Sequence, residues 1–257
     1  MKTADLPSEN QQILAIIPAR MGSSRFPGKP LALINGIPMI GHVYKNISNA
    51  PHIADVIVAT CDKEIADYIT SIGGLAVMTS SAHERASDRC AEALLLMEQM
   101  KPKRYDIVLM VQGDEPMTHP GMVAEVLAPM IRDPSIQVAN LMAEISSLDE
   151  FNDRNCIKVV CDLAGDAIYF SREPIPTLVR GENTHMRKQV CLIPFRRDYL
   201  LLYTGLEPTP LEIAESIDML RVIEHGQKVK MIPTSYQTFA VDTPADLAKV
   251  SELMLSM

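Results

Sequence analysis

The chain has 257 residues, of which 47% are hydrophobic, so it is long enough to bury a substantial core. Its 24 Lys and Arg residues against 32 Asp and Glu residues give a net charge of −8, the wrong sign for nonspecific binding to nucleic acid phosphates. The five cysteines are odd in number and lack the CxxC spacing of zinc sites. The composition predicts a globular protein with reduced cysteines and no nucleic-acid partner.

The start of the chain, MKTADLPSENQQ, is polar and carries acidic residues where a signal peptide needs a basic start and an apolar run. Nowhere do about 18 apolar residues follow one another without interruption, which is the length that a membrane helix requires. We therefore expect a soluble, cytoplasmic protein with no membrane partner.

Along the first 111 residues, short β-rich runs alternate with amphipathic stretches, the rhythm of βαβ units around a parallel sheet. The predicted strands are 13–18, 55–60, 75–78 and 106–111, and the predicted helices are 38–48, 62–72 with Asp62 as its cap, and 87–100. The strand 106–111 is apolar throughout its interior, as expected for a central strand covered on both faces. The sequence thus predicts an α/β, Rossmann-like, mostly parallel sheet flanked by helices.

The rhythm changes between about residues 137 and 196, where strand-like pieces and loops follow one another and only 148–152 suggests a helix. We expect a smaller β-rich lobe there, within a single domain that spans 1–257. The elements predicted after it are helices at 198–203 and 210–225, a strand at 229–233 and a helix from Pro244, with Asp242 and Thr243 as candidate caps.

The loop after the first strand, PARMGSSRFPGKPL, gathers three cations and two glycines. The cations are Arg20, Arg25 and Lys29. Gly22 and Gly28 allow turns whose amides point inward, and the serines add hydroxyl donors, so the loop suits phosphates. A solvated loop is the alternative, but it leaves three cations in a net-acidic chain unexplained. The loop matches neither the P-loop nor the dinucleotide-binding pattern.

Two aspartates, Asp114 and Asp242, stand where a metal ion could be bound. Asp114 comes directly after the central strand, where open α/β sheets place their ligands, and Asp242 opens the late VDTP segment. Mg²⁺ keeps waters and phosphate oxygens, so one or two protein carboxylates suffice. A plain strand-end turn is the alternative for Asp114, and a helix N-cap is an equal alternative for Asp242.

Six segments, in this order and at these distances, resemble those of the 3-deoxy-manno-octulosonate cytidylyltransferases, a family of sugar nucleotidyltransferases. They are PARMGSSRFPGKPL, INGIPMIGHVY, VQGDEP, YFSREPIP, PLEIAESIDMLRV and VDTPADL. The resemblance runs from about Leu14 to Met254. It implies a CTP- and Mg²⁺-dependent enzyme that couples CMP to an acidic 3-deoxy-2-ulosonic sugar, and a homodimer joined through the β-rich region.

The resemblance also implies a direct displacement, in which the anomeric hydroxyl of the sugar attacks the α-phosphorus of CTP and pyrophosphate leaves. The catalytic residues it implies are Arg20, Arg25, Lys29 and Asp114, with Asp114 and Asp242 as metal ligands. The nucleotide-binding residues are Ala19, Gly22, Ser23, Ser24, Ser87, Asp88 and Arg89. The substrate-binding residues are Gln112, Arg172, Gln189, Glu212 and Glu215.

Several of these residues have ordinary structural explanations. A capped helix start accounts almost as well for Ser87 and Asp88, and Ala86 stands where the family usually has glycine. Arg172 could simply end a strand, and Glu212 and Glu215 could line a helix face. Taken together and in family order, however, they favour a site.

The departures from the family pattern cluster on the sugar side. Gln189 and Ile193 replace a usual histidine and tyrosine, Pro194 removes a backbone donor, and the loop 176–187 differs. They leave the acceptor open among a related 3-deoxy-2-ulosonic acid, an amino variant and a different small acid. A noncatalytic nucleotide-binding relative is disfavoured by the intact charged set, and a transferase for another base or a sugar 1-phosphate by the late YFSR and VDTP motifs.

Overall fold

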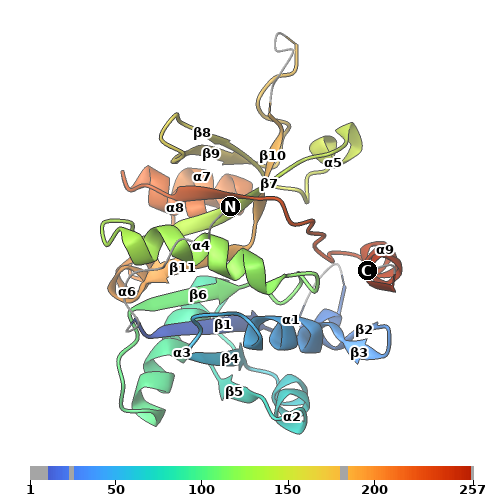
Figure 1. Ribbon diagram of the computed structural model, residues 1–257, viewed down its shortest axis with the longest axis vertical. Helices are drawn as coiled ribbons and strands as arrows, with labels where there is room; N and C mark the ends of the chain where they lie inside the picture. The colour runs from blue at the N-terminus through green and yellow to red at the C-terminus, as the bar shows by residue number, and fades with distance from the viewer. Residues whose placement is uncertain (1–10, 23–25, 180–184, 256–257) are drawn as a thin grey trace.

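Apolar β-rich runs form the first sheet, at the core of the computed structural model, which describes residues 11–22, 26–179 and 185–255. Its strands are β1 (Ile13–Ala19), β4 (Asp55–Thr60), β5 (Leu75–Met78), β6 (Ile107–Val111) and β11 (Leu192–Arg196). Their order is β11-β6-β1-β4-β5. All neighbours pair in parallel except β11 and β6, which are antiparallel. The sheet fills the lower half of Figure 1.

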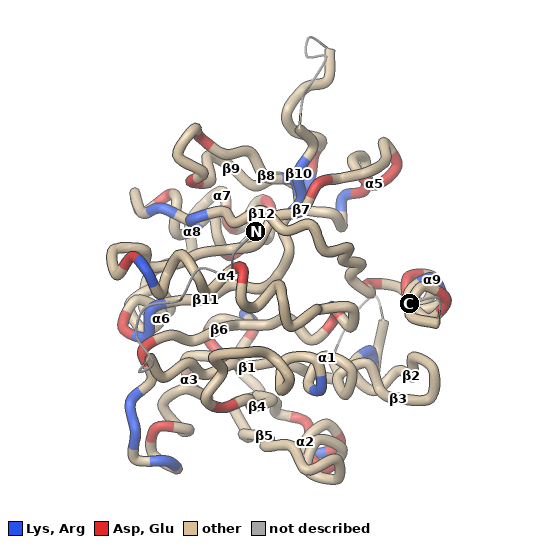
Figure 2. The backbone as a smooth tube through the Cα atoms, viewed as in Figure 1, with Lys and Arg blue, Asp and Glu red and all other residues tan. Residues whose placement is uncertain are grey.

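Helices cover both faces of this sheet because alternate side chains of each strand point to opposite faces. The covering helices are α1 (Met39–Ser48), α2 (Lys63–Ser71), α3 (Ala86–Met100), α4 (Pro120–Arg132) and α6 (Arg197–Thr204). Ile13, Ala15 and Ile17 of β1 pack in the cluster of α1, α2 and α4, while Leu14 and Ile16 pack in the cluster of α3 and α6. The strands β1, β5 and β6 carry no charged residue, as the tan tube in Figure 2 shows.

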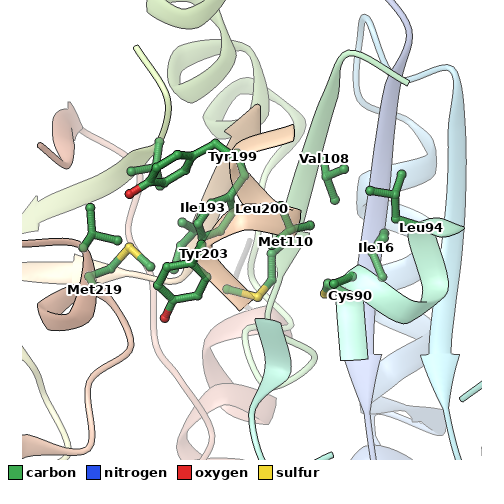
Figure 3. Packing of buried hydrophobic residues seen from close by; sticks show 14 of the residues in the cluster. Ile16, Cys90, Leu94, Val108, Met110, Ile193, Tyr199, Leu200, Tyr203 and Met219 are labelled. Carbon is green, nitrogen blue, oxygen red and sulfur yellow. The ribbon is translucent and has the colours of Figure 1, made fainter. Parts of the chain in front are cut away.

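Figure 3 shows part of the second of these clusters, in which side chains from strands and helices pack together. Ile16 of β1, Met110 of β6 and Ile193 of β11 lie on the same side of the sheet, where Leu94 of α3 and Tyr203 of α6 meet them. All five side chains are at most 2% exposed. Ile193 is therefore a core residue, and its side chain does not face solvent.

A second sheet lies above the first in Figure 1. Its strands are β7 (Ala139–Glu144), β8 (Lys158–Cys161), β9 (Ala167–Ser171), β10 (Arg187–Val190) and β12 (Lys230–Thr234). Their order is β12-β7-β10-β8-β9, and only β12 and β7 pair in parallel. The short helix α5 (Leu148–Asn152) follows β7. The predicted α/β class is confirmed, with a mostly parallel sheet flanked by helices and a second, smaller sheet beside it.

Two element predictions are wrong in their boundaries. The run 189–195, expected as one strand, divides at Cys191 between β10 of the second sheet and β11 of the first, because the chain crosses from one sheet to the other there. The helix expected over 210–225 is broken into α7 (Pro210–Glu215) and α8 (Met219–Glu224), because Ser216 adopts a left-handed conformation with φ of 53°. Helix α4 is not predicted from the sequence.

The remaining elements lie after the loop that follows β1 and at the end of the described chain. They are the single turn η1 (Lys29–Leu31), the strands β2 (Leu33–Ile34) and β3 (Ile37–Pro38), and helix α9 (Pro244–Leu255). The β2–β3 hairpin and α9 share a small apolar cluster that includes Ile34, Met39 and Val250. Within the part of the chain that the structure describes, no helix combines the length and the apolar character that crossing a membrane takes.

Candidate active site

A cleft of about 350 Å³ lies at the carboxyl ends of β1 and β6. Three segments line it, namely the loop after β1, the loop after β6 and the residues that open α3. This is the edge at which parallel sheets place their ligands. The predicted site residues that line the cleft are Ala19, Arg20, Gly22, Lys29, Arg89, Gln112 and Asp114. The predicted residues Ser23, Ser24 and Arg25 lie outside the described residues.

The loop after β1 is anchored by a carboxylate that lies between the neighbouring strand β4 and helix α2. Oδ2 of Asp62 accepts a hydrogen bond from the backbone N–H of Met21 at 2.7 Å. Asp62 stands at the N-cap position of α2, as predicted, but its side chain makes no capping bond to the helix. Gly28, with φ of 74°, closes the loop by donating its N–H to the carbonyl of Met21 at 3.1 Å. Asp62 is thus a loop anchor that the sequence pattern did not reveal.

Lys29 brings the two predicted metal ligands together. Its ammonium donates to Oδ2 of Asp114 and to the carbonyl of Val241, both at 2.8 Å, and lies 3.6 Å from Oδ1 of Asp242. The three side chains are between 13% and 23% exposed. Two residues that lie 85 and 213 positions from Lys29 in the sequence therefore converge on its ammonium, and Lys29 and Asp114 line the cleft.

The start of α9 is capped by Thr243 and Asp246, so Asp242 is not needed as its cap. The hydroxyl of Thr243 accepts from the N–H of Asp246 at 3.3 Å, and Oδ2 of Asp246 accepts from the N–H of Thr243 at 2.8 Å. This reciprocal pair caps the start of α9 in the manner of a capping box. Oδ1 of Asp242 lies 3.6 Å from the ammonium of Lys29, a residue that lines the cleft.

The pair Asp114 and Asp242 fits a magnesium ion that arrives with a triphosphate. Among residues 11–22, 26–179 and 185–255, no three His, Cys, Asp or Glu side chains gather as a complete metal cage. Mg²⁺ does not need one, because it keeps waters and phosphate oxygens and takes only one or two protein carboxylates. The point where the two carboxylates meet already holds a cation, the Lys29 ammonium, so its electrostatics suit positive charge.

Glu115 is a buried carboxyl group that the sequence pattern did not single out. Oε1 accepts from the backbone N–H of Cys191 at 2.9 Å, which fixes the crossing between the two sheets to the end of β6. Oε2 has no hydrogen-bond partner among the described residues. Burial, reinforced by the charge of Asp114, raises the pKa of Glu115 to about 7. Glu115 therefore acts in the framework behind Asp114.

Arg89, a predicted nucleotide-binding residue in the first turn of α3, has one guanidinium nitrogen without a partner among the described residues. Its side chain is buried, and Nη1 donates to the hydroxyl of Thr79. Nη2 has no partner among the described residues, although Arg89 lines the cleft. A buried donor without a partner is costly, so this nitrogen is suited to an oxygen of a bound ligand. Ser87 and Asp88 are not among the described residues that line the cleft, and Ser87 donates to Asp218 at 3.3 Å.

The four other predicted substrate-binding residues do not line this cleft among the described residues. Two of them touch each other, because Oε2 of Glu215 accepts from the backbone N–H of Arg172 at 2.8 Å. Glu212 is fully buried and accepts two hydrogen bonds from Arg221, each 2.7 Å long. Gln189 of β10 donates to Oδ1 of Asn140 at 2.5 Å.

The cleft also contains residues that were not predicted. His83, Glu84 and Arg85 precede α3 and line it. The charged HERASDR segment signalled this region, but Arg85 stands before the stretch that matches the family, so its role was missed.

Known proteins match this chain over most of its length. The family model described as cytidylyltransferase matches residues 14–230. The 3-deoxy-manno-octulosonate cytidylyltransferase of Geobacter metallireducens is 43% identical over 94% of this chain and 97% of its own, and that of Geotalea uraniireducens is 42% identical over 94% and 98%. A solved CMP:2-keto-3-deoxy-manno-octonic acid synthetase, complexed with CTP, superposes with a TM-score of 0.86 at 40% identity, covering 96% of this chain and 99% of that one. The chain belongs to the cytidylyltransferase family, among the 3-deoxy-manno-octulosonate cytidylyltransferases.

Proposed function

We propose that the protein transfers CMP from CTP to 3-deoxy-manno-octulosonate, giving the CMP-sugar and pyrophosphate. The convergence of Lys29, Asp114 and Asp242 at the carboxyl edge of the first sheet carries this proposal. A cleft with this set of charges suits a triphosphate with its cation, and the family membership supports CTP and the acidic sugar as substrates.

The transfer is a displacement at phosphorus. The anomeric oxygen of the sugar forms a bond to the α-phosphorus of CTP, the bond from that phosphorus to the bridging oxygen of the β-phosphate breaks, and the hydroxyl proton passes to solvent. Arg20 and Lys29, with Arg25 in the same loop, neutralise the charge that develops on pyrophosphate. The backbone of Gly22 and the buried guanidinium of Arg89 hold the nucleotide in line.

Cytidylyltransferases generally use a divalent metal ion. We propose Mg²⁺, held by Asp114 and Asp242. When bound, it neutralises triphosphate oxygens and polarises the α-phosphate. The chain would contribute two carboxylates, Asp114 after β6 and Asp242 before α9. The Lys29 ammonium offsets part of their negative charge.

On the acceptor side, Gln112 lines the cleft beside Asp114, and its amide group can donate to and accept from sugar hydroxyls. Arg172 and Glu215 lie together at the end of β9, and we propose that Arg172 meets the sugar carboxylate. A different small acidic acceptor is the second candidate, favoured by Gln189, which donates to Asn140 rather than presenting a histidine.

A panel assay tests this function. The protein is incubated with Mg²⁺, each of the four nucleoside triphosphates and a series of acidic ketoses, and pyrophosphate release is followed. We expect release with CTP and 3-deoxy-manno-octulosonate and at least about a hundredfold less with the other nucleotides. Release with CTP and another acid alone would select the second candidate, and release with no pair would refute the enzymatic function.

We further propose a homodimer formed through the second sheet, in the cytoplasm where CTP is made. Ile168 on β9, at the open edge of that sheet, is 56% exposed, which suits a covered surface in an assembly. Light scattering during size exclusion tests this. A mass of twice 28.4 kDa is expected, and Ile168→Lys should lower it toward one chain.

A further inference from the structure

Arg85 lines the cleft, yet the transfer reaction described above gives it no role. It stands at the N-cap position of α3 in an extended conformation, with its side chain 28% exposed. The guanidinium reaches across to the α7–α8 turn (residues 215–218). Nη1 donates to Oδ1 of Asp218 at 3.1 Å and to the hydroxyl of Ser216 at 3.5 Å, and Nη2 lies 3.7 Å from Oε1 of Glu212.

Charge balance makes Arg85 necessary to this turn. Glu212 already has Arg221, whose two nitrogens donate to its two oxygens at 2.7 Å, with both side chains at most 4% exposed. Among the described residues, Arg85 supplies the ion pair of Asp218, whose side chain is 19% exposed. Burial raises the pKa of Asp218 and Arg85 opposes that rise. Without Arg85, this largely desolvated carboxylate would lose its direct ion pair and keep the Ser87 hydroxyl and the coulombic attraction of Arg221.

The same turn orients Arg172. Nε of Arg172 donates to the carbonyl of Glu215 at 2.6 Å, and Nη2 donates to the carbonyl of Ser216 at 3.4 Å. The carboxylate of Glu215 accepts from the Arg172 backbone and from the hydroxyls of Tyr169 and Ser171. Nη1 of Arg172 donates to the carbonyl of Arg154 at 2.9 Å, outside the turn. Two of the three contacts that orient the Arg172 guanidinium therefore come from the turn.

The turn cannot keep its shape by local preference alone. Ser216 has φ of 53° and ψ of 51°, a left-handed conformation that is unfavourable for a residue with a side chain. Such a conformation persists when surrounding contacts hold it. Those contacts come from three places: from the residue before α3 through Arg85, from the residue after β9 through Arg172, and from α6 through Tyr203, whose hydroxyl donates to the carbonyl of Asp218 at 2.9 Å.

We propose that Arg85 is a positioning residue for the acceptor: it holds the α7–α8 turn against the start of α3, and thereby sets the place of Arg172. This rests on the proposed function, in which Arg172 meets the sugar carboxylate. Because the Arg85 guanidinium is directed at the turn, its loss should weaken binding of the acidic sugar and leave binding of CTP nearly unchanged.

Steady-state kinetics with both substrates varied gives the first test. We expect Arg85→Gln to raise KM for the sugar about tenfold, with kcat and KM for CTP within about twofold of wild type. Arg85→Lys keeps a charge beside Asp218 but loses the planar reach to Ser216 and Glu212, so it should raise the sugar KM about threefold. Arg104→Gln removes an exposed arginine that pairs with Asp198 and should change neither constant.

A double-mutant cycle separates positioning from direct binding. If Arg85 acts by holding Asp218, Arg85→Gln and Asp218→Asn combined should raise the sugar KM no further than Arg85→Gln alone. Additive effects on the sugar KM would overturn the proposal. A rise in KM for CTP that exceeds the rise for the sugar would also overturn it, and would make Arg85 a nucleotide ligand. If Arg85→Gln does not fold, Arg85→Lys provides the same test, with a smaller expected rise in the sugar KM and an unchanged KM for CTP.

Amide hydrogen exchange gives a test that does not depend on activity. In Arg85→Gln we expect faster exchange over 211–218 and at Arg172, whose N–H donates to Glu215, and unchanged exchange in β1. Uniformly faster exchange would mean that Arg85 supports the whole fold, and the proposal would be wrong. A wild-type protein that releases no pyrophosphate would refute the proposed function, while the exchange over 211–218 would still decide whether Arg85 holds the turn.

Discussion

The proposed nucleotide side and the proposed acceptor side of this molecule, called the nucleotide side and the acceptor side below, use their charged residues in opposite ways. Around the cleft, Arg89 keeps a buried nitrogen without a partner among the described residues, and Asp114 and Asp242 both lie within 3.6 Å of the Lys29 ammonium. On the acceptor side, Glu212 and Arg172 have most of their polar atoms occupied by the protein itself. The first arrangement is prepared for a ligand, whereas the second first builds the framework that will hold one.

This contrast predicts that a substitution on the nucleotide side shows itself in catalysis. Asp114→Ala removes one of the two carboxylates that meet at Lys29, and we expect kcat to fall by at least about a thousandfold. The side chain is 23% exposed, so the circular dichroism spectrum should remain that of wild type. Asp67→Ala, which removes an exposed partner of Lys63, is the matched control and should keep full activity. A near-normal rate in Asp114→Ala would show that the metal assignment is wrong.

A substitution on the acceptor side should instead show itself in stability. Arg221→Met removes both hydrogen bonds that Arg221 donates to the fully buried Glu212 and leaves it the weaker contact with Arg85, whose Nη2 lies 3.7 Å from Oε1. We expect the free energy of unfolding to fall by about 3–5 kcal/mol in a urea titration. Lys63→Met breaks an exposed pair with Asp67 and should cost less than about 0.5 kcal/mol. If Arg221→Met changes the free energy of unfolding as little as Lys63→Met does, while the sugar KM rises, then the Arg221–Glu212 pair serves substrate binding. The proposed difference between the nucleotide side and the acceptor side would then be wrong.

Within the nucleotide side, the anchor of the phosphate loop can be separated from its charges. Asp62→Ala removes the acceptor of the Met21 N–H, and we expect KM for CTP to rise about tenfold while KM for the sugar stays within about twofold. Asp62→Asn keeps an acceptor oxygen at the same place and should recover most of the loss. An equal rise in both constants would mean that Asp62 supports the cleft as a whole.

The fold could be predicted where apolar periodicity alone decides it. Strand β4 was predicted at its observed limits, and β1, α1 and α3 within a residue, because each lies between a clear turn signal and a buried run. The crossing at Cys191 could not be predicted, because QVCLIPF reads as one continuous apolar strand and only pairing with β7 and β6 divides it.

The site could be predicted in the same uneven way. Asp114 follows the end of β6 and Lys29 ends the loop after β1, and because these parallel strands are neighbours, topology brings both segments to one edge of the sheet. Asp62 and Glu115 also stand next to strands, but a cap and a turn explain them equally well, and only the structure shows that their oxygens bind Met21 and Cys191. Contacts of this kind between distant segments leave no local signal in the sequence.

The smallest effect concerns an ion pair that lies outside both sides of the site. Arg197 donates through Nε and Nη2 to the two oxygens of Glu98, at 2.9 and 2.7 Å, which joins α3 to α6, and these bonds hold the pKa of Glu98 below its usual range. A carboxylate with a lowered pKa stabilises the folded state above the pKa of the unfolded chain, about 4.5, and loses this contribution as the pH falls through the folded pKa.

Glu98→Gln should therefore lower the free energy of unfolding by about 1–2 kcal/mol at pH 7, with the difference from wild type shrinking below about pH 4. Urea titrations at the two pH values measure it. The kinetic constants should not change, since neither Glu98 nor Arg197 is among the described residues that line the cleft. A difference that persisted at low pH would mean that Glu98 acts through packing rather than charge. A loss of activity at full stability would tie this pair to the cleft, and the division between ligand-binding and framework charges would have to be drawn elsewhere.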